Sequence, residues 1–168
     1  ALLMIGDRPI ADFSGDDDRT TVCANLYPQV RLSILRGHPW NCCAARVVLS
    51  PDATAPAFGP YTYRFQLPAD CLRVISVGED GLEIDWRVEG RFVLCNDAVC
   101  RLRYVSADVV EAYLDQLLVD LLTVAMAARI AYPLTKSASL AAEMQQQYRL
   151  ALAQAKAIDG QEDPPETL

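Results

Sequence analysis

The chain has 168 residues, of which 52% are hydrophobic and 22% charged. This is enough apolar material for a packed core, and it excludes a globally disordered chain. The net charge of -7 and the pI of about 4.6 argue against a surface that grips nucleic acid through its phosphates, because that attraction needs a basic surface. An acidic chain could still line a passage through which DNA slides without sticking.

Apolar runs along the chain are too short or too interrupted to span a bilayer. The richest run, from Leu117 to Ala131, contains Asp120 and Arg129. The opening Ala1-Leu2-Leu3-Met4-Ile5 is too short for the core of a signal peptide and lacks a basic start. We therefore expect no membrane contact and a cytoplasmic origin.

The first predicted helix begins at Asp16-Asp17-Asp18, because carboxylates cap a helix and favour its positive N-terminus. Its buried stripe is predicted from apolar residues at every fourth position, namely Val22, Leu26, Val30 and Ile34. Pro28 falls inside this stretch and should kink the helix or remove one backbone hydrogen bond. Gly37 followed by Pro39 predicts its end.

From residue 44 to residue 105 the apolar period changes to two, which is typical of half-buried strands. The clearest alternating runs are Tyr61 to Leu67, Ile84 to Val88 and Cys100 to Tyr104. Turns are predicted at Gly78-Glu79-Asp80-Gly81, at Glu89-Gly90 and at Asn96-Asp97. About five or six strands with no helix between them predict an antiparallel sheet, and Ser50 to Pro60 predicts a surface loop.

Two long helices are predicted to follow the strands. Ser106 is expected to cap the first of them, with Asp108 in its first turn and Pro133 ending it after Tyr132. Its apolar residues lie on most sides, which predicts a buried helix; they are Val110, Leu114, Leu117, Leu118, Leu121, Leu122, Val124, Met126 and Ala128.

The last predicted helix runs from about Thr135 to Ile158, and Gly160 is its expected stop. Its apolar seam is Leu140, Met144, Tyr148, Leu152 and Ala155. The acidic, proline-containing tail of residues 161–168 is expected to be disordered alone. The fold class is therefore α+β: a helical bundle of residues 1–43 and 106–160 with long C-terminal helices, an inserted antiparallel β-rich subdomain of residues 44–105, and a flexible acidic tail.

The residues predict no catalytic, cofactor or metal site. The single histidine, His38, is predicted to be a loop residue, and Asp16-Asp17-Asp18 lacks the spacing of a calcium loop. The six cysteines lack the paired spacing of zinc ligands and are expected to pack as small apolar thiols. The sequence has no nucleophile elbow, phosphate-binding loop or dinucleotide fingerprint, so we expect a protein that is not an enzyme.

Three segments, in order, resemble the tail tubular protein A family of short-tailed bacteriophages. Ile5-Gly6-Asp7-Arg8-Pro9-Ile10 is similar to the I-G-x-x-P-V start of that family, and Pro68 to Val74 is similar to its P-x-D-C-L-R-V stretch. Ala131 to Ser137 resembles the junction of the family's last two helices. The resemblance covers nearly the whole chain, although Pro28 interrupts a helix that it implies to be continuous.

The resemblance implies a head-to-tail adaptor without catalytic residues or cofactors, assembled in the host bacterial cytoplasm and located in the virion. Its partners would be further copies of itself in a dodecameric ring, the portal protein, the tail nozzle protein, and double-stranded DNA that passes without specific binding. Portal docking would involve Tyr148, Leu152, Ile158, Gln161, Glu162 and Asp163. The strand arginines Arg64, Arg87, Arg101 and Arg103 would face the nozzle or a neighbouring subunit.

Two alternatives remain from the residues alone. The first is a cellular helical oligomerisation or interaction module without catalytic activity, whose composition would look the same. The second is a small hydrolase that uses His38 or a cysteine.

Overall fold

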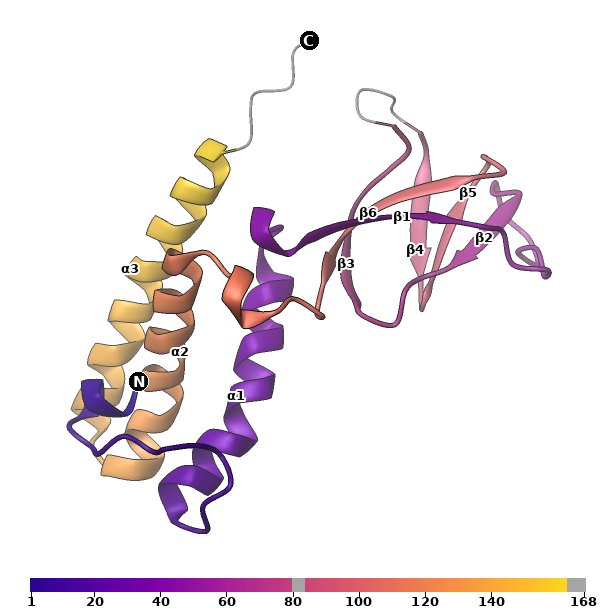
Figure 1. The fold of residues 1–168 in the computed structure, drawn as a ribbon. Coiled ribbons are helices and arrows are strands. Elements are labelled where there is room, and N and C mark those ends of the chain that lie inside the picture. The colour runs from indigo at the N-terminus through magenta and orange to yellow at the C-terminus, as the bar shows by residue number, and fades with distance from the viewer. Residues whose placement is uncertain (80–83, 163–168) are drawn as a thin grey trace. The chain divides into compact units, whose positions relative to one another are not determined.

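The computed structural model describes residues 1–79 and 84–162 and has an α+β fold (Figure 1). The chain divides into two compact units. The helical unit consists of residues 1–38 and 110–162, and the β-rich unit of Pro39–Val109. The boundaries fall at residues 38/39 and 109/110, where we had predicted 43/44 and 105/106. Residues 107–109 belong to the β-rich unit, where the Ala107 N–H donates to the Asp70 carbonyl at 2.8 Å.

Helix α1 (Asp18–Gly37) begins where the sequence predicted, because the Asp17 carboxylate accepts hydrogen bonds from the Arg19 and Thr20 amides. The helix continues through Pro28, which lies on its exposed side. The predicted stripe is correct only in its second half: Val30 and Ile34 are buried. In the first half the buried positions are Thr20 and Cys23.

Helix α2 (Gln116–Thr135) begins ten residues later than Ser106, the cap that we predicted. Ser106 instead accepts from the Asp108 amide at 3.0 Å, so its hydroxyl closes a turn after a strand. A short 3-10 turn (Glu111–Tyr113) follows, and Asp115 caps α2 by accepting from the Leu117 amide at 2.8 Å.

The C-terminal end of α2 lies beyond Tyr132, where we predicted a break. Pro133 stays inside the last turn, and Thr135 Oγ1 donates to the Ala131 carbonyl at 2.6 Å. Lys136 then ends the helix in the left-handed region, with its N–H donating to the Tyr132 carbonyl at 2.9 Å. A proline in the last turn removes one backbone hydrogen bond, but the residues after it remain free to complete that turn.

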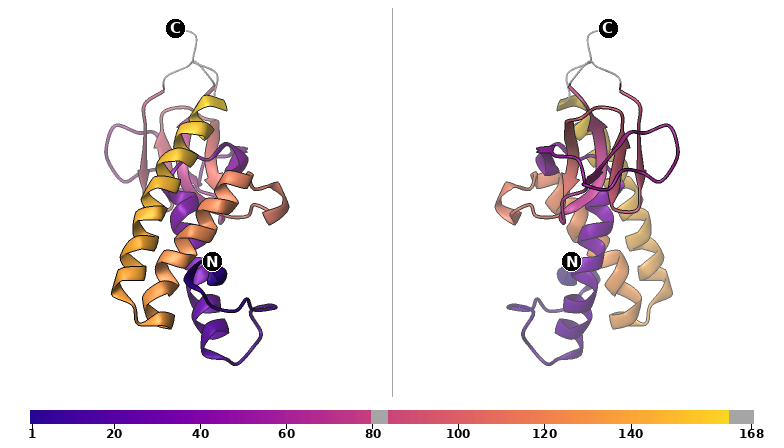
Figure 2. Two further views of the ribbon diagram at one scale, coloured as in Figure 1. Left: turned by 90° about the vertical axis from the view of Figure 1, so that its left-hand side faces the viewer. Right: turned by 90° about the vertical axis from the view of Figure 1, so that its right-hand side faces the viewer.

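Helix α2 is buried on most sides, as predicted, and packs against both α1 and α3 (Figure 2). By length and composition alone it is also sufficient to cross a membrane, contrary to our expectation that no segment would be. The same apolar surface forms the core of the helical unit, in which Leu121, Ala127 and Ile130 are fully buried.

Helix α3 (Ala138–Glu162) follows α2 after a turn at Lys136 and Ser137 and runs beside it in both views of Figure 2. Met144 and Ala155 are buried on its seam. Gly160 does not stop the helix, contrary to the prediction, since one exposed glycine costs only about 1 kcal/mol within a helix. Gln161 and Glu162 are therefore helical and do not belong to a tail.

The β-rich unit has six strands, and all observed pairings are antiparallel, as predicted. They are β1 (Ala44–Leu49), β2 (Tyr63–Gln66), β3 (Cys71–Val77), β4 (Trp86–Glu89), β5 (Phe92–Cys95) and β6 (Cys100–Ser106). They form two three-stranded sheets, with strand orders β1-β6-β3 and β2-β5-β4, where we expected one sheet.

Turn chemistry explains the connection between β4 and β5. Gly90, with φ of 60°, lies in the predicted β4–β5 hairpin turn. Asn96-Asp97 instead links strands of different sheets, and the predicted turn from Gly78 to Gly81 lies partly outside the described residues. The segment from Ser50 to Pro60 has no helix or strand, as predicted. The buried faces of the two sheets share one core, which includes Phe65, Val93 and Leu102.

Candidate interaction surfaces

The four strand arginines do not form one stripe. Arg64 and Arg87 lie on the β2-β5-β4 sheet, both opposite Leu94, whereas Arg101 and Arg103 are on strand β6 of the other sheet. The four arginines therefore lie on two different sheets, and their assignment to a contact with the nozzle or a neighbouring subunit stays a prediction. Strand pairing brings together residues that are distant in the chain. The alternation of apolar and polar residues within one strand does not reveal which residues will be paired.

Arg64 packs against its own unit. Its guanidinium lies 4.5 Å from the centroid of the Phe92 ring and 3.2 Å from Asp52 Oδ1. The Asp52 amide in turn donates to the Arg64 carbonyl at 2.8 Å. These contacts attach the start of the 50–60 loop to strand β2. The Thr54 amide and the Arg64 guanidinium lower the pKa of the Asp52 carboxyl, which favours its charged form.

The outer face of the β1-β6-β3 sheet holds a shallow hollow of about 450 Å³ that includes three arginines. Arg46 of β1 is directly opposite Arg103 of β6, and Val48 is opposite Arg101. Like charges directly opposite one another disfavour pairing unless anions lie nearby. Glu79 lines the hollow and its carboxylate is 3.2 Å from the Arg101 guanidinium. Sequence reasoning missed Arg46, because only the strand register reveals its neighbour.

The residues predicted to dock on a portal lie along α3. Tyr148, Leu152 and Ile158 are half-buried, on a helix that packs against α2. Gln161 and Glu162 are exposed in its last turn. Asp163 lies outside the described residues. The structure thus places the five described residues of this set on one helix, with Tyr148, Leu152 and Ile158 partly covered and Gln161 and Glu162 exposed.

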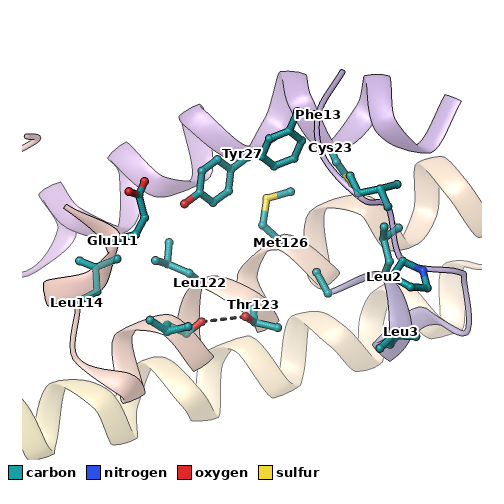
Figure 3. A pocket seen from close by; sticks show the side chains of 14 residues that line it. Leu2, Leu3, Phe13, Cys23, Tyr27, Glu111, Leu114, Leu122, Thr123 and Met126 are labelled. Atoms are coloured by element: carbon teal, nitrogen blue, oxygen red, sulfur yellow. Dashed lines mark hydrogen bonds between the residues drawn. The ribbon is translucent and has the colours of Figure 1, made fainter. Parts of the chain in front are cut away.

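The helical unit has an apolar groove between the N-terminal segment, α1 and the start of α2 (Figure 3). Its volume is about 490 Å³. The side chains of Leu2, Tyr27, Leu122 and Met126 line it, and Glu111 is the one acidic residue in the described part of its lining. Burial raises the pKa of the Cys23 thiol, which also lines the groove, so that this thiol stays neutral. We call this feature the apolar groove.

Large apolar side chains remain exposed beside the apolar groove. Leu3 is 72% exposed and Phe13 is 51% exposed, and both line it. Phe13 stacks on Tyr27 with 5.5 Å between ring centroids. Tyr113, in the same 3-10 turn as Glu111, is 76% exposed. Exposed apolar surface beside a concavity is typical of sites that bind another molecule.

Sequence reasoning did not find the apolar groove. The opening Ala1 to Ile5 was weighed only as a possible signal peptide, although Leu2 and Ile5 are buried and Leu3 is exposed. Leu2 and Ile5 are three residues apart, the spacing that places two side chains on one face of a 3-10 turn, and this was the available signal. The packing of α1 and α2, which creates the concavity, was not readable from either helix alone.

The segment from Pro68 to Val74 is held by a network around Asp70. The Asp70 carboxylate accepts from Ser106 Oγ at 2.5 Å and from the Tyr104 hydroxyl at 3.1 Å. The Arg91 guanidinium donates to the Cys71 carbonyl at 3.0 Å and to the carbonyls of Pro68 and Ala69. Burial, together with the Asp70 charge, raises the pKa of Tyr104. This segment therefore anchors β3 to β6.

His38 follows α1 as its C-cap residue, and its Nε2 is 2.9 Å from Asp159 Oδ2 near the end of α3. Both side chains are largely covered, with 20% and 13% exposure. The pair joins the C-terminal ends of α1 and α3. His38 lies outside helix and strand, which agrees with the prediction of a loop residue, and its partner is 121 positions away in sequence.

Five of the six cysteines are buried and Cys42 is half-buried, which confirms the prediction that they pack within the fold. Burial raises the pKa of Cys100 to about 12, so that this thiol stays protonated. Within residues 1–79 and 84–162, no group of three or more histidine, cysteine, aspartate or glutamate side chains is placed to hold a metal ion.

Compared with known proteins, the chain matches no family model and no curated protein sequence.

Proposed function

We propose that this chain is a structural head-to-tail adaptor of a short-tailed phage, a subunit of a dodecameric ring between portal and tail nozzle that extends the DNA channel. In this proposal the protein is not an enzyme and needs no cofactor. Its partners are further copies of itself, the portal protein, the nozzle protein and DNA that passes without specific binding. It acts in the virion after assembly in the host cytoplasm.

The resemblance of three segments supports this class of protein, and each segment has a definable place in the fold. Ile5 to Ile10 includes two residues of the apolar groove, Pro9 and Ile10. Pro68 to Val74 includes Asp70 of the strand-anchoring network. Ala131 to Ser137 spans the end of α2 and the turn before α3.

The observation that carries the proposal is the apolar groove with Leu3, Phe13 and Tyr113 exposed in or beside it. A ring of identical subunits needs a heterologous contact, in which one face of a subunit meets a different face of the next. An open apolar surface supplies the free energy for such a contact, since apolar burial stabilises association by about 25 cal/mol per Å² before entropic costs.

The negative charge supports the passage of DNA without binding. At a net charge of -7, attraction to phosphates is weak except at local clusters such as Arg46, Arg101 and Arg103. We assign this cluster, together with Arg87, to a contact with the nozzle or a neighbouring subunit. Arg64 is less available for such a contact, because its guanidinium already lies against Phe92 and Asp52.

Portal docking is assigned to the C-terminal part of α3 and the residues after it. The test is deletion of residues 161–168, which we expect to reduce portal binding while the melting temperature stays close to that of the full chain. Unchanged portal binding would remove this assignment.

The proposal as a whole is tested by native mass spectrometry of the chain alone and mixed with portal protein. We expect a monomer or small oligomer alone and a closed ring on the portal. A fixed dimer that ignores the portal would refute the proposal and would favour the cellular oligomerisation module.

A further inference from the structure

Phe58 is the most exposed large apolar side chain among the described residues, at 92%. It lies in the 50–60 loop of the β-rich unit. An aromatic side chain in this position offers a large apolar surface at low cost in conformational entropy, since only two side-chain torsions become fixed on binding. Phe58 is therefore suited to be an anchor at an interface.

The loop that carries Phe58 is held at its base. The Asp52 amide donates to the Arg64 carbonyl at 2.8 Å, and the Asp52 carboxylate accepts from the Thr54 amide at 2.8 Å. Pro56 and Pro60 restrict the backbone on either side of Phe58. Gly59 has φ of 111°, a conformation that favours glycine. A loop restricted in this way loses less entropy when it binds.

The apolar groove of the helical unit matches this loop in chemistry and in size. Residues 53–60 carry no charge, and among the described residues that line the groove only Glu111 has a charged side chain. The groove volume of about 490 Å³ is in the range of sites that enclose small organic ligands, so it admits a phenyl ring with adjoining backbone. Phe13, Tyr27 and Met126 offer aromatic and sulfur contacts to an inserted ring (Figure 3).

We propose that Phe58 of one copy inserts into the apolar groove of a second copy. This inference rests on the proposed function, because it names the contact that joins successive subunits. The anchor belongs to the β-rich unit and the groove to the helical unit, so the contact is heterologous and propagates from copy to copy. Loss of an anchor at the centre of an interface weakens association roughly 30-fold.

The experiment replaces Phe58 with a photoreactive phenylalanine analogue in the full chain. This protein is mixed with ¹⁵N-labelled wild-type chain, assembled on portal protein and irradiated. Mass spectrometry of the cross-linked peptides then identifies the position and the copy that received each link. We expect links from position 58 to ¹⁵N-labelled peptides containing Leu3, Tyr27 or Met126.

Two controls accompany this experiment. The same analogue at Leu150, which is 63% exposed on α3, should not label the groove peptides. Leu3→Glu places a charge at the groove and should reduce the yield of groove links about tenfold or more, whereas Leu3→Met should leave it unchanged.

The outcomes separate this inference from the proposed function. Rings that form while position 58 links to other surfaces would overturn the Phe58 contact and leave the adaptor role standing. Links to groove peptides of the same unlabelled copy only would also overturn it. A chain that never assembles on portal would refute both.

Discussion

The β-rich unit and the helical unit differ in the kind of apolar surface that they leave exposed: the β-rich unit exposes the loop side chain Phe58, whereas the helical unit leaves a groove open. In the β-rich unit, both sheets bury one face in a shared core, and arginines on the outer faces lie against Asp52, Glu79 and Phe92. In the helical unit, α2 is buried on most sides, yet an apolar groove stays open with Leu3 and Phe13 exposed in it. In our proposal the helical unit therefore provides the receiving surface for another copy, and the β-rich unit provides the inserted side chain.

The largest effect is expected in the core of the β-rich unit. Phe65 is fully buried there, so Phe65→Ala should lower the free energy of unfolding by about 3–5 kcal/mol. Urea titration followed by circular dichroism measures this loss. A loss below about 1 kcal/mol would mean that the two sheets do not share one packed core.

The helical unit should respond similarly at its own core. Leu121 is fully buried on α2, and Leu121→Ala should cost about 2–5 kcal/mol in the same titration. The exposed Leu150 of α3 gives the matched control, since Leu150→Ala should change stability by no more than about 0.5 kcal/mol. Equal losses at both positions would contradict the burial described for α2.

Loss of one hydrogen bond in the Asp70 network should lower the stability less than the core substitutions do, and this loss should depend on pH. Tyr104→Phe removes the hydroxyl that donates to Asp70 and should cost about 1.5 kcal/mol at neutral pH. Because burial and the Asp70 charge raise the pKa of Tyr104, the stabilisation is present below the pKa of an unfolded tyrosine and is lost as the pH rises through the folded value.

Unfolding measurements of wild type and Tyr104→Phe between neutral and alkaline pH test this prediction. The stability difference should shrink as the pH rises. A difference that stays constant would show that the hydroxyl does not interact with Asp70 as described.

A substitution in the apolar groove should weaken the association of copies while leaving the free energy of unfolding nearly unchanged. Leu3→Glu alters a side chain that is 72% exposed, so the free energy of unfolding should change by no more than about 0.5 kcal/mol. Association of copies should nevertheless weaken, because the new carboxylate must lose water in an apolar contact. Thermal melting and analytical ultracentrifugation of the same samples measure the two quantities.

The smallest effect is expected at the start of α1. The Thr20 hydroxyl and amide donate to the Asp17 carboxylate and lower its pKa. The charged carboxylate therefore contributes to folding stability above the pKa of an unfolded aspartate, and this contribution is lost as the pH falls through the folded value. Asp17→Asn keeps a capping side chain without this titration. Wild-type stability should therefore approach that of Asp17→Asn on acidification, and parallel curves would contradict the role of the charge.

Local patterns in the sequence predicted much of the fold. The period of two located β2, β4 and β6, and Asp17 marked the start of α1, because both signals depend on neighbours in the chain. Predictions based on single residues at helix ends were wrong at Ser106, Pro133 and Gly160. There, the hydrogen bonds of Ser106 and Thr135 and the packing of α3 outweighed local preference.

The interaction surfaces were harder to predict because they depend on long-range pairing. The Arg46–Arg103 pair exists only through the β1–β6 register, and the apolar groove exists only where the N-terminal segment meets α1 and α2. The resemblance to a phage family pointed to a class of protein without locating either surface.

The most direct test of the account compares wild type with Leu3→Glu by native mass spectrometry in the presence of portal protein. We predict a closed ring on the portal for wild type and little or no ring for Leu3→Glu, with both chains folded by circular dichroism. Rings of equal abundance for the two proteins would contradict the role of the apolar groove. The absence of a wild-type ring would contradict the adaptor function itself.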